Sequence, residues 1–76
     1  MRNKLISIIS DVLEIDQAEI DEDFEQSHAE NWDSLNHLNL IISIEEQFDV
    51  SFEPEEIATM TSLKKIEEKL KEKEGN

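Results

Sequence analysis

Apolar residues recur at three- and four-residue spacings in three stretches of the chain. In the first stretch, over residues 3–14, the repeating positions are Leu5, Ile6, Ile8, Ile9, Val12 and Leu13. Side chains with this spacing lie on one side of a helix, so the pattern predicts an amphipathic helix with a single apolar side. The same spacing predicts a second helix over residues 33–48 and a last helix over residues 62–73.

The segment between the first two helices has a different pattern. Residues 15–32 lose the helical period, and single apolar residues stand among acids at Ile15, Ile20 and Phe24. An unanchored loop of this length is unusual in a small domain. We therefore interpret the segment as a long loop that its apolar side chains fasten to the core, and we expect Trp32 to close it as a further core residue.

The remaining segment predicts a short helix. Pro54 has the backbone angle that the first turn of a helix needs, so a helix is expected over residues 54–60. No stretch of useful length alternates apolar and polar residues as a strand does. The sequence therefore predicts an all-α fold, a small antiparallel four-helix bundle with three longer helices and one short helix, formed by one domain over residues 1–76.

The predicted helix over residues 33–48 carries apolar residues on two opposite sides. One side holds Leu40, Ile41, Ile44 and Phe48. The other side holds Leu35, Leu38 and Ile42, with Asn39 and Glu46 at its border. Either neighbouring elements wrap this helix completely, or the second side stays partly exposed. In the second case, apolar side chains with acids around them suit a protein partner that has an apolar groove and basic edges.

The start of this helix places a hydroxyl group at a favourable position. Asp33 is a good N-cap because its carboxylate can accept a backbone N–H of the first turn, which makes Ser34 the first helical residue. The N-terminus of a helix carries a partial positive charge that stabilises anions. A phosphate ester on Ser34 would benefit from that field, although serine is also an ordinary residue at this position.

The distribution of charge excludes several classes of partner. The formal net charge is −13, and no lysine or arginine lies between Lys4 and Lys64. Such a surface repels nucleic acids and anionic membranes, and it favours basic protein surfaces, although acids also keep a small protein in solution. We expect a monomer without a membrane span, since the longest apolar run has only three residues, Leu40 to Ile42.

The chain contains no cysteine, so it has neither disulfides nor a thiolate metal site, and we expect it in the cytoplasm. No metal site is predicted. A calcium loop that began at Asp21 would have Gln26 where glycine is required and Trp32 where glutamate is required. Weak cation binding by the acids of residues 16–25 stays open.

The chain resembles the acyl carrier proteins over nearly its whole length. The resemblance rests on Asp33-Ser34-Leu35, on the following run from Leu40 to Phe48, and on the segment from Phe52 to Leu63. It implies that Ser34 carries a covalent 4′-phosphopantetheine arm derived from coenzyme A. It also implies a chain that is not an enzyme, and that holds an acyl or aminoacyl group as a thioester and shuttles it between enzymes.

The resemblance further implies which residues meet the partners. Asp33 would cap the helix and contact the phosphopantetheinyl transferase, and acyl-loading, synthase or transferase enzymes with basic docking patches would bind the helix after Ser34. The implied partner-binding residues are Leu35, Leu38, Asn39, Ile42, Glu45 and Glu46. The residues expected to line a pocket for the acyl chain are Ile42, Phe52, Ile57 and Met60.

Several positions depart from the family pattern. Asn31 stands where glycine is frequent, and Asn36 and Asn39 stand where carriers of fatty-acid synthesis usually have acids. Together with Phe52 and a one-residue displacement of Pro54, these differences resemble stand-alone carriers of specialised pathways. Fatty-acid, polyketide and other specialised metabolites all remain candidate products of the pathway that the carrier serves.

Two other functions would also use residues of this segment. A hydrolase would combine Ser34, His37 and Asp33, but no oxyanion hole or nucleophile elbow accompanies them, and we expect His37 to be a solvated helix residue near the partner-binding side. His28 is expected to be a loop residue without a role. The stronger alternative is an unmodified acidic module for protein–protein interaction, which would keep the bundle and have no use for the hydroxyl of Ser34.

Overall fold

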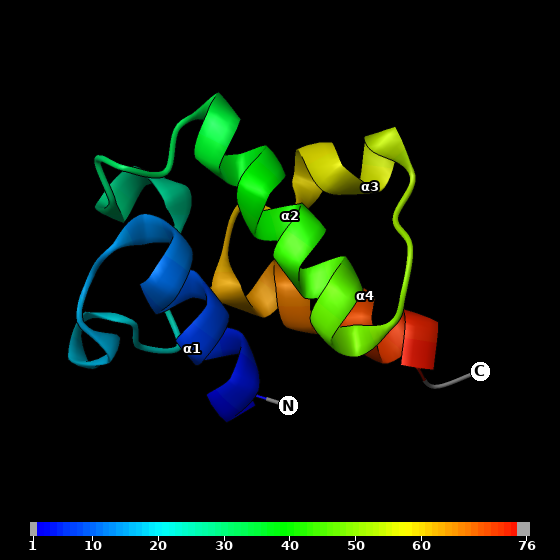
Figure 1. Cartoon of the computed structure of the whole chain (residues 1–76), viewed down its shortest axis with the longest axis horizontal. Helices are drawn as coiled ribbons and strands as arrows, with labels where there is room; N and C mark the ends of the chain where they lie inside the picture. Colours follow the sequence, from blue (N-terminus) through cyan, green and yellow to red (C-terminus); the bar gives the residue numbers. More distant parts are fainter. Residues whose placement is uncertain (1, 75–76) are drawn as a thin grey trace.

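The computed structural model describes residues 2–74 of the chain. They form the helices α1 (Arg2–Leu13), α2 (Ser34–Phe48), α3 (Pro54–Thr59) and α4 (Leu63–Glu74). Figure 1 shows α1 and α2 side by side, running in nearly opposite directions, with the short α3 beside the first half of α2. The predicted all-α bundle of three longer helices and one short helix is confirmed, and each helix begins and ends within one residue of its expected bounds.

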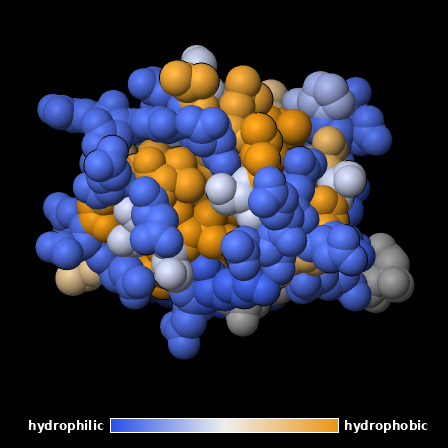
Figure 2. Space-filling model, viewed as in Figure 1, coloured by the Kyte–Doolittle hydropathy of each residue, from blue (hydrophilic) through white to orange (hydrophobic). Residues whose placement is uncertain are grey.

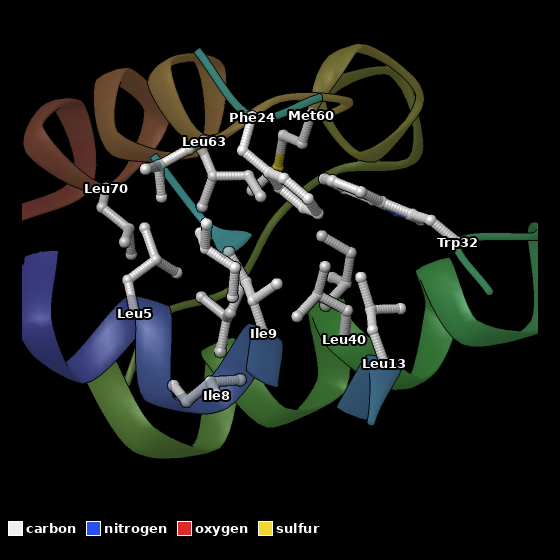
Figure 3. Packing of buried hydrophobic residues seen from close by; sticks show 14 of the residues in the cluster. Leu5, Ile8, Ile9, Leu13, Phe24, Trp32, Leu40, Met60, Leu63 and Leu70 are labelled. Carbon is white, nitrogen blue, oxygen red and sulfur yellow. The ribbon is translucent and has the colours of Figure 1, made fainter. Parts of the chain in front are cut away.

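Helices α1, α2 and α4 contribute buried side chains to the core, whereas the buried residues near α3 are its neighbours Phe52 and Met60. Among the described residues, the buried apolar side chains are Leu5, Ile8, Ile9, Leu13, Ile20, Phe24, Trp32, Leu40, Ile41, Ile44, Phe52, Met60, Leu63, Ile66 and Leu70. Figure 3 shows side chains of α1, α2 and α4 meeting around Phe24 and Met60. The helical spacing of the sequence therefore identified the sides of α1 and α4 that are buried.

The loop before α2 is fastened to the core, as its apolar residues predicted. Ile20 and Phe24 are buried, and Ile15 packs against the core. The loop also pairs with the segment before α4: Gln26 N–H donates to the Thr61 carbonyl at 2.9 Å, and Leu63 N–H donates to the Phe24 carbonyl at 2.9 Å. These contacts hold the loop in place from both sides.

Two helices end on residues with left-handed backbone angles. Glu14 has φ 55° after α1, and Asp49 has φ 54° after α2. In both places the next N–H donates to a carbonyl five residues earlier: Ile15 to Ser10 and Val50 to Glu45. This is the hydrogen bond that closes a helix C-terminus, and it is usually accompanied by glycine at the left-handed position.

A side-chain ion pair connects the first helix, α1, to the last helix, α4. Arg2 donates two hydrogen bonds to Glu67, one from Nε to Oε2 at 2.9 Å and one from Nη2 to Oε1 at 2.8 Å, and so joins α1 to α4. These hydrogen bonds and the charge of Arg2 hold the pKa of the Glu67 carboxyl below its ordinary value.

None of the helices in residues 2–74 is long and apolar enough to cross a membrane.

Candidate functional site

Ser34 opens α2 at the surface of the molecule. Asp33 adopts an extended backbone, and its Oδ1 accepts the N–H of Asn36 at 2.8 Å, which is the predicted cap of the helix. The Asp33 carbonyl accepts the N–H of His37 at 2.8 Å and begins the helical hydrogen bonding. The Ser34 hydroxyl therefore belongs to an exposed residue at the positive end of a 15-residue helix.

Trp32 anchors the chain two residues before Ser34. Its side chain is 2% exposed and stacks on Phe24, with 5.8 Å between ring centroids and 19° between ring planes. Its backbone is held as well, since its N–H donates to the Ala29 carbonyl and its own carbonyl accepts Nε2 of Gln26 at 2.8 Å. Figure 3 shows the indole directed into the core, as expected for a residue that closes the loop.

Asn31 and Asn36 connect the start of α2 to the end of α1. The Asn36 amide Nδ2 donates to the Asn31 carbonyl at 2.7 Å, and the Asn31 amide Nδ2 donates to the Leu13 carbonyl at 2.9 Å. Glycine at position 31 has no side chain to donate, and an ionised acid at position 36 could only accept, so neither contact could form with the residues that the family usually has there. This gives a local structural reason for two of the residues that depart from the acyl carrier pattern.

His37 is not the solvated residue that we expected. It is partly buried, and its ring lies between two partners. Nδ1 is 2.9 Å from the indole Nε1 of Trp32, and Nε2 is 2.8 Å from the carbonyl oxygen of Ile57 in α3. No sequence pattern predicts this arrangement, because Trp32 precedes the helix and no helical spacing relates α2 to Ile57.

The second apolar side of α2 is exposed. Leu35, Leu38 and Ile42, here called the apolar strip, are 68%, 52% and 51% exposed, whereas Leu40, Ile41 and Ile44 are buried. A fully wrapped central helix is therefore excluded. Figure 2 shows apolar atoms at the surface over α2, with hydrophilic groups around them. Large exposed side chains in a row are the kind of surface that protein partners cover.

The polar residues predicted beside the apolar strip differ in their surroundings. Glu46 and Asn39 are exposed, and the Asn39 amide lies 3.4 Å from Oδ1 of Asn36. Glu45 is partly buried, and its Oε2 accepts the N–H of Phe52 at 2.9 Å. Glu45 therefore holds the segment that connects α2 to α3, in addition to any contact that it makes with a partner.

The residues expected to line an acyl-chain pocket lie at different depths. Met60 is fully buried and Phe52 is 8% exposed, so both belong to the closed core. Ile57 is partly buried against that core, and Ile42 lies in the apolar strip. A pocket that all four residues line would require α3 to move away from α2.

Short helix α3 is held from the side of α4 by charge. Glu56 lies 3.0 Å from Nζ of Lys73 and 3.9 Å from Nζ of Lys69. Its carboxylate also accepts the N–H of Glu53 at 2.9 Å. That backbone hydrogen bond, followed by the contact with Lys73, holds the pKa of the Glu56 carboxyl below its ordinary value.

The site offers Ser34 no catalytic base. The carboxylate of Asp33 caps the helix, and both ring nitrogens of His37 are engaged by Trp32 and Ile57. No group of three or more histidine, aspartate or glutamate side chains in residues 2–74 is arranged to hold a metal ion. The exposed hydroxyl at a helix N-terminus nevertheless suits an attached phosphodiester, whose negative charge the helix end would stabilise.

Comparison with known proteins identifies the family. The family model for a phosphopantetheine attachment site matches residues 3–70 of the chain. None of the curated proteins matches the chain. Proteins of this family are non-catalytic carriers with a covalently attached 4′-phosphopantetheine, and a phosphopantetheinyl transferase is among their partner enzymes. Since the match spans nearly all of α1, the loop, α2, α3 and most of α4, the chain belongs to the phosphopantetheine-binding carrier protein family.

Proposed function

We propose that Ser34 is the attachment residue and that the chain carries an acyl or aminoacyl group on its arm. The observation that carries this proposal is the exposed Ser34 at the capped N-terminus of α2, inside the segment that matches the family. In the attachment step, Oγ of Ser34 bonds to the phosphorus next to the pantetheine of coenzyme A. The bond from that phosphorus to 3′,5′-ADP breaks, and a base of the transferase takes the hydroxyl proton.

The chain's own residues orient this step. Asp33 fixes the first turn of α2 through Asn36, and the buried Trp32 fixes the approach to it, so Ser34 has a defined position for the transferase. The helix N-terminus then stabilises the phosphodiester. When bound, the arm supplies a thiol that holds the cargo as a thioester. The chain has no cysteine of its own that would compete for the cargo.

Partner enzymes are proposed to bind the apolar strip. Leu35 and Leu38 follow Ser34 within the first turns of α2, and Ile42 continues their row. Burying these side chains supplies affinity, while Glu45 and Glu46 attract basic patches and raise the association rate. We infer a monomeric, cytoplasmic carrier that serves a synthase or transferase of fatty-acid, polyketide or specialised metabolism. Ile42, Phe52, Ile57 and Met60 are proposed to line the acyl pocket once α3 moves.

The test of Ser34 is intact mass spectrometry after incubation with coenzyme A, Mg²⁺ and a broad-specificity phosphopantetheinyl transferase. Wild type should gain one phosphopantetheine, and Ser34→Ala should gain none. The matched control is Ser43→Ala, which removes another serine hydroxyl of α2 and should leave the gain intact. A modified Ser34→Ala variant would disprove the attachment residue.

An unmodified interaction module is the second candidate. It is favoured by one observation, since the exposed apolar strip would bind a partner whether or not Ser34 is modified. In the same mass experiment, a folded wild type that gains nothing would make this module the better assignment.

A further inference from the structure

We propose that His37 is a positioning residue that couples α3 to the attachment site. This proposal rests on the proposed function of Ser34. The hydrogen bonds of His37 do not depend on that function. His37 follows Ser34 by three residues and Trp32 precedes Ser34 by two, so the hydroxyl lies on a short segment between two residues that bind each other. Through Nε2, the same ring reaches the backbone of α3 at Ile57.

The two hydrogen-bond partners determine which ring nitrogen of His37 carries the proton. The indole Nε1 of Trp32 can only donate, and the carbonyl of Ile57 can only accept. Nδ1 of His37 must therefore accept and Nε2 must carry the proton, and the neutral ring with its proton on Nε2 satisfies both contacts at once. The imidazole therefore links Trp32 to α3 by accepting one hydrogen bond and donating another.

The connection matters to α3 because this helix has little stability of its own. It contains six residues, Pro54–Thr59, and isolated helices of that length do not persist in water. The Ile57 carbonyl lies near its C-terminus and accepts the N–H of Met60, the residue that ends the helix, at 3.2 Å. His37 supplies a second donor to that carbonyl from α2, while Glu56 of α3 pairs with Lys73 of α4.

The connection also matters to Trp32. Its side chain is almost completely buried, and the described hydrogen bond from its indole N–H goes to His37. Without that acceptor, a buried donor would be left without a partner, which proteins rarely tolerate. A displacement of α3 that pulls on His37 is therefore transmitted to Trp32 and to the segment that presents Ser34.

Two substitutions of His37 separate the effect of its hydrogen bonds from the effect of its ring shape. His37→Phe keeps a ring but removes both hydrogen bonds, and His37→Gln keeps one acceptor and one donor. The matched control is His28→Phe, since His28 is an exposed loop histidine whose described contact is an edge-on approach to Phe24. Each variant is compared with the unmodified wild-type chain by residue-resolved amide and indole hydrogen exchange.

In His37→Phe, exchange of the α3 amides and of the Trp32 indole N–H should become about tenfold faster than in wild type, while α1 and α4 change little. His37→Gln should recover part of the protection, and His28→Phe should match wild type. Unchanged exchange in α3 and at the indole would overturn the coupling. An equal acceleration in all four helices would also overturn it, because it would indicate general destabilisation.

The second readout is the rate of transfer to Ser34 at carrier concentrations below and above the KM of the transferase. His37→Phe should raise KM several-fold with little change in kcat, because the segment is presented less often in its bound form. Wild-type kinetics in a variant with a loosened α3 would overturn the positioning role. A wild type that is never modified would instead refute the attachment to Ser34, and the exchange result would then decide the coupling alone.

Discussion

Asp33 has two roles that different substitutions can separate. Its carboxylate caps α2 by accepting the N–H of Asn36, and we propose that its charge beside Ser34 contacts the transferase. Asparagine caps helices as well as aspartate does but has no charge. The cap therefore serves the fold, whereas the charge is proposed to serve recognition.

We expect Asp33→Ala to lower the free energy of unfolding by about 1 kcal/mol, and Asp33→Asn to change it little. Urea denaturation followed by circular dichroism measures both. If the charge contacts the transferase, Asp33→Asn should slow attachment to Ser34 despite its normal stability. Equal attachment rates in Asp33→Asn and wild type would remove that contact from the proposal.

Helix positions were predictable because they depend on local features. The spacing of apolar residues, the cap at Asp33 and the proline at Pro54 place the helices within one residue of their observed bounds. The sequence could not decide whether neighbouring elements cover the second apolar side of α2, since that depends on where the other helices pack. Nor could it place His37, whose partner Ile57 is twenty residues away in another helix.

The two left-handed helix ends offer a further prediction. Glu14 adopts φ 55° at the end of α1, an angle that costs a side-chain-bearing residue roughly 1–2 kcal/mol and that glycine adopts freely. Glu14→Gly should therefore raise the free energy of unfolding by roughly 0.5–1 kcal/mol, net of the backbone entropy of glycine. Thermal unfolding measures the gain. Glu14→Ala is the control and should bring none, so an equal gain in both variants would point to charge instead of backbone strain.

The connection between α1 and α4 should make stability depend on pH. The pKa of the Glu67 carboxyl is lower in the folded protein because Arg2 donates hydrogen bonds to its ionised form. Its contribution is therefore complete above the unfolded pKa, which is about 4.3 for glutamate, and is lost as the pH falls through the lower folded value.

Glu67→Gln should melt at a lower temperature than wild type at pH 7, and the gap should shrink as the pH falls below about 4.3. Melting curves of both proteins from pH 7 to pH 3 test this prediction. Glu68→Gln serves as a control on the same helix and should show a smaller gap. A gap for Glu67→Gln that stays constant over this range would contradict the ion pair as its source.

At the scale of the whole molecule, the net charge of −13 is confined to a body of 32 × 23 × 20 Å. The screening length is about 30 Å at 10 mM salt and about 8 Å at 150 mM. At the lower concentration every acid therefore repels the others across the molecule, whereas at the higher concentration only neighbours interact.

We expect the melting temperature to rise when NaCl is increased from 10 to 150 mM, because repulsion destabilises the compact state. KCl at equal ionic strength should give the same rise, since screening does not depend on the identity of the cation. A melting temperature that stays constant or falls would show that repulsion contributes little to the stability of this bundle.

The pairing of the loop with the segment before α4 sets an order of events during translation. The loop leaves the ribosome early, but Thr61 and Leu63, which fasten it, are synthesised only after α3. A nascent chain that ends at α3 therefore displays Ser34 behind a loop that still lacks its hydrogen bonds to Thr61 and Leu63. A transferase that recognises the anchored form would act only after α4 has emerged, so truncated chains would consume no coenzyme A.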